Sequence, residues 1–293
     1  MKKITKAFAI CLALLAAGCE KSQIALPGNS SPVFKATFLQ GTPTRTQLDT
    51  DEATVLWSEG DEISIFDGDG ANVEYISTVS SDRTTADFNP VSSEGLADPE
   101  VWYSFYPYQE GASIDGSTIT ATMPSEYSVS APGSFADGMN LAVASSSTLT
   151  LPFKSILGWI RVAVKGVEGV TKIVFSGNSG ETLAGTISVD ADDLSVAVTG
   201  DASSKITLSI SDFQESESRD SRQNYYIPTL PITYEAGFTV RVYVGTTSYT
   251  YSYSGEVTFV RSQARGLFVD LGDVDPDEDA DIDPGTPGED DDL

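Results

Sequence analysis

The sequence predicts an all-β protein built from antiparallel sandwiches. Short runs rich in Val, Ile, Thr and Tyr recur along the chain, and Gly, Asp, Asn or Ser residues separate them, as is typical of antiparallel sandwiches. No segment predicts a helix longer than two turns, and the nearest candidate is one turn between Pro152 and Gly158. Both halves have similar strand density, so we predict tandem sandwich domains at residues 33–150 and 151–272 rather than one large barrel.

The composition limits the chemistry of the chain. Its 293 residues are 40% hydrophobic, and 43 acidic against 17 basic residues give a formal charge of −26. Such a field repels phosphate backbones, so nucleic acid is a poor partner. Histidine is absent and the two cysteines are Cys11 and Cys19, which excludes Ser–His–Asp and Cys–His machinery and a Cys/His zinc site. We predict no cofactor, no metal and no enzyme activity, since no carboxylate constellation of a glycoside hydrolase is recognisable.

The N-terminus predicts export and lipid attachment. Residues 1–6 are basic and residues 7–15 form an apolar run too short to span a bilayer, so residues 1–18 have the form of a signal peptide. The segment Leu15-Ala16-Ala17-Gly18-Cys19 matches the bacterial lipoprotein signal, in which Cys19 is acylated. The alternative is a secreted protein cut at a small residue with an incidental cysteine. Residues 19–32 then form a Ser/Pro/Gly tether.

The first predicted strand, residues 33–39, is followed by residues 44–66, around which the chain is organised. In this stretch two apolar runs flank the polar break at residues 58–61, which predicts strands at 53–57 and 62–67 joined by a turn. Arg45 stands upstream between two threonines, in a chain with few basic residues. It is a candidate site for a trypsin-like protease, or it merely decorates a strand end.

Two further stretches of the first domain carry alternative readings. Residues 67–70, Asp-Gly-Asp-Gly, suggest calcium, but an EF-hand loop needs a bidentate Glu at its twelfth position, where this chain has Thr78. A hairpin turn before a strand at 72–79 is simpler. Residues 101–108 are aromatic-rich and are either a carbohydrate platform or, as we favour, core. A hairpin at 114–121 and a loop at 125–140 complete the domain.

The second domain continues the same pattern of short strands. One strand has Tyr249, Tyr251 and Tyr253 on one face, either as a ligand stripe or, as we favour, packed inward. Residues 273–293 have no basic residue and almost no apolar one, so we predict a disordered acidic tail. The predicted strands of this half are residues 141–144, 148–153, 157–165, 170–176, 184–189, 194–199, 205–210, 223–227, 237–244, 247–253, 256–260 and 266–271.

Several short motifs, in this order, resemble the fimbrillin-like (Mfa-like) lipoproteins of Bacteroidales over about residues 19–272. The resemblance implies two transthyretin-like sandwich domains and a lipid-anchored precursor that a protease cuts after an arginine. The cut releases the first strand, and a strand of another subunit fills the open groove. The motifs are Thr44-Arg45-Thr46, Trp57-Ser58-Glu59-Gly60-Asp61, Tyr103-Ser104-Phe105-Tyr106-Pro107-Tyr108, Met123-Pro124-Ser125-Glu126, Gly133-Ser134-Phe135-Ala136-Asp137-Gly138 and Leu151-Pro152-Phe153-Lys154-Ser155 before Leu157-Gly158-Trp159-Ile160.

Carried onto this chain, the resemblance makes Arg45 the processing site and Cys19 the anchor. The released strand contains Val33, Phe34, Ala36 and Phe38, and the C-terminal donor candidate contains Leu267, Val269 and Leu271. The long acidic tail departs from the family pattern and is a poor donor. The implied protein is a subunit on the cell outer membrane that pairs with other fimbrial subunits and contacts a host or glycan receptor. The alternative is a non-polymerising, glycan-binding surface lipoprotein.

Overall fold

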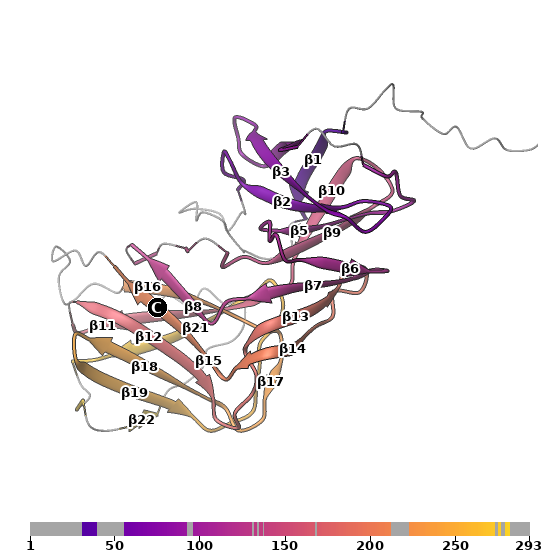
Figure 1. Ribbon diagram of the computed structural model, residues 1–293. Helices are drawn as coiled ribbons and strands as arrows, with labels where there is room; N and C mark the ends of the chain where they lie inside the picture. Colours follow the sequence, from indigo (N-terminus) through magenta and orange to yellow (C-terminus); the bar gives the residue numbers. More distant parts are fainter. Residues whose placement is uncertain are drawn as a thin grey trace, which may run out of the picture.

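The computed structural model describes residues 31–39, 56–92, 96–130, 132–133, 135–136, 138–167, 169–211, 223–272, 275–276 and 279–281. Every regular element in these residues is a β-strand, so the all-β prediction is confirmed. Figure 1 shows two lobes, a barrel at the upper right and a sandwich at the lower left. Within the described ranges, no helix is long and apolar enough to cross a membrane.

The first lobe is a closed barrel, where the sequence predicted a sandwich. Its strands follow the order β1-β10-β9-β5-β2-β3-β4. Alternate residues of each strand point inward. They fill the interior with rings such as Phe34, Tyr75, Phe88 and Phe153, together with Trp57 from the segment before β2. The strands are β1 (Phe34–Phe38), β2 (Glu62–Phe66), β3 (Asn72–Val79), β4 (Thr85–Pro90), β5 (Trp102–Tyr106), β9 (Ala142–Ser146) and β10 (Thr150–Ser155).

The second lobe contains a six-stranded sheet, order β22-β19-β18-β12-β15-β8, a three-stranded sheet, order β16-β11-β21, a four-stranded sheet, order β14-β13-β7-β6, and the pair β17-β20. The strands are β6 (Ser113–Asp115), β7 (Thr118–Met123), β8 (Glu126–Val129), β11 (Gly158–Lys165), β12 (Val170–Gly177), β13 (Ala184–Asp190), β14 (Val196–Ser203), β15 (Lys205–Ile210), β16 (Gln223–Thr229), β17 (Thr233–Tyr234), β18 (Phe238–Val244), β19 (Thr247–Tyr253), β20 (Val257–Thr258), β21 (Ala264–Asp270) and β22 (Asp279–Asp281).

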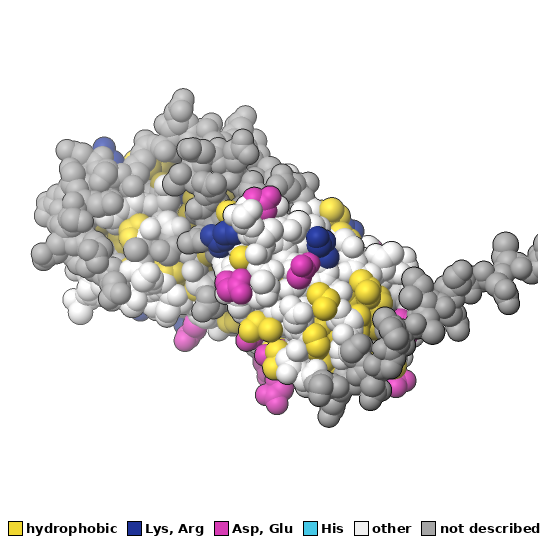
Figure 2. Space-filling model, turned by 90° about the horizontal axis from the view of Figure 1, so that it is seen from above, with side chains coloured by type: hydrophobic (Ala, Val, Ile, Leu, Met, Phe, Trp, Pro, Cys, Tyr) yellow, Lys and Arg dark blue, Asp and Glu magenta, His cyan; other side chains and the backbone are white. Residues whose placement is uncertain are grey.

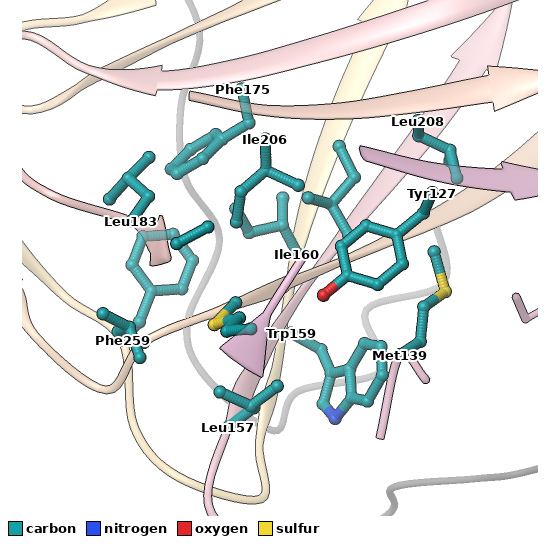
Figure 3. Close-up of a cluster of buried hydrophobic side chains, with 14 of the residues drawn as sticks. Tyr127, Met139, Leu157, Trp159, Ile160, Phe175, Leu183, Ile206, Leu208 and Phe259 are labelled. Atoms are coloured by element: carbon teal, nitrogen blue, oxygen red, sulfur yellow. The ribbon is translucent and has the colours of Figure 1, made fainter. Parts of the chain in front are cut away.

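The core of the second lobe lies between these sheets. Figure 3 shows Trp159 and Ile160 of β11 facing Tyr127 of β8, with Ile206 and Leu208 of β15 beside them. All five side chains are buried. Ile206 and Leu208 stand at alternate positions of β15, whereas Trp159 and Ile160 are consecutive in β11 and both buried. Burial of such apolar surface is what drives two sheets to pack.

The predicted boundary at residue 150 does not coincide with the sheets. β7 pairs with β13 and β8 pairs with β15, so the segment from β6 to β8 belongs to the second lobe. β10 then returns to the barrel, where it pairs with β1 and β9. The chain therefore crosses between the lobes three times, because strand pairing over long sequence separations decides the lobe to which each strand belongs.

Four local expectations were wrong. Pairs β1–β10, β15–β8, β11–β21 and β19–β22 are parallel, so the sheets are mixed rather than antiparallel. The predicted loop at 125–140 begins with β8, and the helical turn after Pro152 is strand β10 leading to a short link. Within the predicted disordered tail, β22 pairs with β19, since backbone bonds to a sheet edge need no apolar side chains.

Three local predictions are confirmed. Asp67 closes the turn at residues 67–70, where its Oδ1 accepts hydrogen bonds from the N–H groups of Asp69 and Ala71 at 3.0 and 2.8 Å. The aromatic segment is core, since Trp102 and Phe105 of β5 are buried. The tyrosine face of β19 packs inward with Tyr251 buried.

Candidate functional site

The candidate site is the β1 slot, which we define as the space between β10 and β4 that strand β1 fills. β1 pairs with β10 in parallel and with β4 in antiparallel orientation. The N–H groups of Lys35 and Leu39 donate to the carbonyls of Leu149 and Phe153 at 2.9 and 2.8 Å. Without β1, the barrel would present two unpaired edges that face each other across one strand width.

The inward side chains of β1 make aromatic contacts across the barrel interior. Phe34 meets Tyr75 and Trp102 edge-to-face, with ring centroids 5.3 and 5.0 Å apart. Ala36 is also fully buried, and Phe38 packs at the far end of the strand. The slot therefore accepts two large rings with a small residue between them, at alternate positions of one strand.

Val33, the first of the four residues predicted for the released strand, does not fill the slot. Val33 is 48% exposed. Because successive side chains of a strand point to opposite faces, Val33 points away when Phe34 and Ala36 point inward. The released strand predicted from the sequence thus keeps Phe34, Ala36 and Phe38 as its inward residues.

Residues 40–55, which connect β1 to Trp57, contain Arg45 and lie outside the described part of the chain. The two flanks of this segment touch. Phe38 stacks on Trp57 with ring centroids 4.4 Å apart, and Phe153 meets both rings. A cut at Arg45 would therefore remove the covalent link between two surfaces that remain in contact.

The segment after Trp57 is fastened to the barrel by its own polar motif. Asp61 accepts a hydrogen bond from the Ser58 N–H at 2.7 Å, and Gly60 takes the positive φ of 83° that the turn requires. Ser77 of β3 donates its hydroxyl to the Ser58 carbonyl at 2.8 Å. These bonds hold the Trp57 side of the slot independently of β1.

Arg83 clamps the same segment, and the sequence prediction did not single it out. Its Nε donates to the Trp57 carbonyl at 2.8 Å and its guanidinium donates to the Ser58 hydroxyl at 2.9 Å. The Trp57 N–H donates in return to the Arg83 carbonyl at 2.8 Å. The only sequence signal near Arg83 was the turn-forming run of polar residues at 80–84. In that turn, hydrogen bonds from Ser80 and Thr84 lower the pKa of Asp82.

The interior of the slot is apolar and neutral. Burial raises the pKa of Tyr75, which lines it, to about 12. In the described ranges, no three His, Cys, Asp or Glu residues gather as metal ligands. The slot is therefore suited to a β-strand with apolar side chains at alternate positions.

Hydrophobic groups also gather around the barrel surface. Among the described residues, most of the exposed large hydrophobic side chains belong to the barrel, and two of them, Val33 and Leu39, bracket β1. Figure 2 looks down on the molecule and shows hydrophobic groups on the barrel, at the right, between a few charged ones. The others are Ile76, Val91 and Leu149.

The predicted donor residues have a different environment from the one expected. Leu267 and Val269 are completely buried and Leu271 nearly so, all within the core of the second lobe. β21 pairs with β11 over its whole length, and Tyr251 donates its hydroxyl to the Asp270 carbonyl at 3.1 Å. A free donor strand at this position is not what the structure contains. The predicted anchor Cys19 lies outside the described residues.

Comparison with known proteins identifies the fold. No family model and no curated protein matches the chain. A solved structure of a candidate cell adhesion protein from Bacteroides ovatus matches 88% of this chain and 97% of that one, at 14% identity and a TM-score of 0.55. A similar candidate from Bacteroides uniformis matches 89% of this chain and 97% of that one, at 15% identity and a TM-score of 0.53.

A third match is the tip fimbrial protein Mfa3 from Porphyromonas gingivalis, with 9% identity and a TM-score of 0.37 over 87% of this chain and 99% of that one. The two Bacteroides structures share the fold of this chain, and the resemblance drawn from the sequence agrees with that fold. The functions in the three names are those of the matched proteins.

Proposed function

We propose that this chain is a lipid-anchored subunit of a fimbrial or adhesive structure on the cell surface, and that its β1 slot accepts a strand from another subunit. One observation carries the proposal. A single strand, β1, fills the slot through Phe34, Ala36 and Phe38, and the segment that follows it in the chain contains Arg45. The fold shared with candidate cell adhesion proteins supports a place on the cell surface.

In the proposed sequence of events, a protease cuts after Arg45 and leaves β1 held only by backbone bonds and ring contacts. β1 then leaves, which exposes the edges of β4 and β10 and the rings beneath them. A strand of another subunit restores the backbone bonds and refills the interior with alternate apolar side chains. This is β-strand addition, in which the backbone gives affinity and the pockets give specificity.

The buried state of β21 bears on the position of this subunit in an assembly. A shaft subunit both accepts and donates a strand, and donation of Leu267, Val269 and Leu271 would require β21 to leave its own core. A tip or anchor position, or a stand-alone surface role, needs only the acceptor slot. We therefore propose an end position, with acylated Cys19 as the attachment to the outer membrane.

A strand-replacement experiment tests the proposal. Residues 20–293 are treated briefly with an arginine-specific protease and mixed with a fluorescent peptide of residues 31–39. We expect the peptide to enter the cut protein and to stay bound on gel filtration, and the uncut protein to exclude it.

Two controls isolate the features that matter. An Arg45→Ala chain treated in the same way should exclude the peptide, and a peptide with Asp at positions 34 and 38 should not enter the cut wild-type chain. Entry into the Arg45→Ala chain, or failure of the wild-type peptide to enter a chain cut after Arg45, would overturn the proposed route.

The alternative function, glycan binding through exposed aromatic rings, is not favoured by the arrangement of the rings. Trp102 and Phe105 are buried, and Tyr251 packs into the core. A glycan would have to bind a different surface.

A further inference from the structure

Strand β19 lies next to the last strand of the six-stranded sheet, and its sequence makes it an edge to which other strands readily pair. Its seven residues, Thr247–Tyr253, are all Thr, Ser or Tyr. Sheet edges are usually protected from association by charged residues, prolines or bulges. β19 contains no charged residue and no proline, and its register with β18 is regular throughout. Short uncharged runs of β-branched and aromatic residues are the sequences that associate by strand pairing.

β19 itself is firmly held in the second lobe. It pairs with β18 over all seven of its residues. Tyr251 is buried, and its hydroxyl donates to the Asp270 carbonyl at 3.1 Å. Tyr249 and Tyr253 pack against the same core. The strand therefore stays in place whether or not its second edge is covered.

The second edge of β19 is covered by β22, which is a much shorter strand. Its three residues, Asp279–Asp281, pair in parallel with Thr250–Ser252, so the pairing spans less than half of β19. Figure 1 shows both strands at the lower margin of the second lobe, on the side away from the barrel. A three-residue pairing offers few backbone hydrogen bonds, and such a segment opens at a small fraction of the free energy of global unfolding.

The segment that carries β22 also opposes association by its charge. Residues 273–293 include eleven acidic residues and no basic one. Two such segments brought to one shared edge would repel each other, most strongly at low ionic strength. β22 thus occupies the backbone groups of the edge and places negative charge beside an otherwise uncharged strand.

We propose that β22 is a removable cover, and that the edge beneath it pairs with β19 of a second copy of this chain. A two-fold axis at Thr250 brings the whole of both strands together in antiparallel register and continues the sheet from one molecule into the next. Tyr249 of one copy then lies opposite Tyr251 of the other, and Ser248 lies opposite Ser252. All these pairs are uncharged, and aromatic and hydroxyl pairs across strands are favourable.

The backbone geometry of the edge agrees with this pairing. Two residues, 245–246, join β18 to β19, and Val244 is in register with Thr247. In a hairpin closed in this way, alternate residues beginning with Thr247 exchange hydrogen bonds with β18. The N–H and C=O groups of Ser248, Thr250 and Ser252 are therefore directed to the other edge. These are the groups that an antiparallel pair with its axis at Thr250 uses, so the edge is complementary to itself.

A variant of the cover tests the proposal in the chain of residues 20–293. Ala280→Pro removes an N–H group from the middle of β22 and keeps every acidic residue, whereas the matched control Ala280→Ser keeps the N–H. Sedimentation equilibrium at raised salt, where repulsion between the acidic segments is screened, measures self-association. We expect Ala280→Pro to dimerise at least about tenfold more tightly than the wild-type and Ala280→Ser chains, which is the scale of one backbone hydrogen bond.

An introduced cysteine locates the contact. Residues 20–293 contain no cysteine, because Cys11 and Cys19 precede them. In the Ala280→Pro chain, Thr250→Cys should give a disulfide-linked dimer on mild oxidation, because hydrogen-bonded antiparallel partners have Cα atoms about 5.5 Å apart. Thr120→Cys, at an exposed position of β7, is the control and should remain unlinked.

Three results would overturn the proposal. An Ala280→Pro chain that stays monomeric would show that β22 is not what prevents association. Equal cross-linking through positions 250 and 120 would indicate random collision. A dimer that persists when Ser248→Pro is added would place the contact elsewhere, because this change removes an edge N–H outside the residues that β22 covers. None of these outcomes depends on a cut at Arg45 or on β1, which belongs to the barrel, so the strand-replacement proposal stands or falls separately.

Discussion

Phe38 of β1 stacks on Trp57, with ring centroids 4.4 Å apart and ring planes inclined by 29°. The two residues flank the segment that contains Arg45, so each side of the candidate cleavage site ends at the same aromatic contact. Once the chain is cut, this contact and the hydrogen bond from the Leu39 N–H to the Phe153 carbonyl hold the end of β1 in place.

The stacked pair gives the first prediction. Phe38→Ala should lower the free energy of unfolding of the barrel by about 2–4 kcal/mol, because a largely buried ring is lost from a packed interior. Val33→Ala, at the residue just before β1, should cost less than about 0.5 kcal/mol, because Val33 is 48% exposed. Urea unfolding followed by tryptophan fluorescence measures both, and equal costs would contradict the assignment of inward and outward faces.

Arg83 gives the second prediction. Its side chain donates to the Trp57 carbonyl and the Ser58 hydroxyl, and hydrogen bonds to charged groups contribute about 1.5–3 kcal/mol each. Arg83→Ala should therefore destabilise the barrel by about 3 kcal/mol or more. Arg241→Ala at an exposed position of β18 is the control and should stay within about 0.5 kcal/mol. A stable Arg83→Ala protein would mean that the clamp is dispensable.

Two buried tyrosines give a third prediction with opposite signs. In the described part of the chain the Tyr127 hydroxyl is buried without a hydrogen-bond partner, whereas the Tyr234 hydroxyl lies 2.8 Å from the Thr229 hydroxyl. Tyr127→Phe should raise thermal stability, since it removes an unsatisfied polar group, and Tyr234→Phe should lower it by about 1 kcal/mol. Scanning calorimetry on the pair checks the signs, and a loss of stability in Tyr127→Phe would refute the first.

Alkaline pH gives the fourth prediction. Burial raises the pKa of Tyr75 from 10.0 to about 12, so its neutral form is the one that the fold favours. Its contribution to stability is complete below pH 10 and is lost as pH rises from 10 to about 12, because the unfolded chain loses its proton first. Tyr75→Phe should flatten the decline of stability across that window in short unfolding measurements. An unchanged slope would show that Tyr75 does not titrate as proposed.

Two glycines with positive φ give the fifth prediction. Gly60 (φ 83°) has open space where a Cβ would stand, whereas a Cβ on Gly237 (φ 75°) would collide with the backbone of Tyr253 and Gly255. Gly60→Ala should cost about 1–2 kcal/mol from the left-handed backbone alone. Gly237→Ala should cost clearly more because the chain before β18 and the end of β19 must also move apart. Chemical denaturation of both variants separates strain from collision.

Much of the local structure could be predicted from the residues. Residues 33–39 were predicted to form a strand, and β1 lies within them, although Val33 had been grouped with Phe34, Ala36 and Phe38. The run Asp67-Gly68-Asp69-Gly70 was predicted to form a turn. Strand β4 was not predicted, because Asp87, Asn89 and Pro90 are residues that strands disfavour. Its buried residues Ala86 and Phe88 nevertheless alternate with more exposed ones, as in other strands. The tyrosine face of β19 was predicted to pack inward, and it does.

The sequence by itself determined that the chain is made of strands, where most of them run, and which side of each strand is apolar. The tertiary structure decided which strands pair. It closed β1 to β4 and β10, moved β7 and β8 into the second lobe, buried the predicted donor β21 against β11, and added β22 at a sheet edge. The physical reason is that a two-residue period determines the face that a side chain occupies, but backbone hydrogen bonds are the same for every partner. Which strand pairs with which is decided by side-chain packing between segments that are far apart in the sequence, and a local sequence pattern holds no information about that packing.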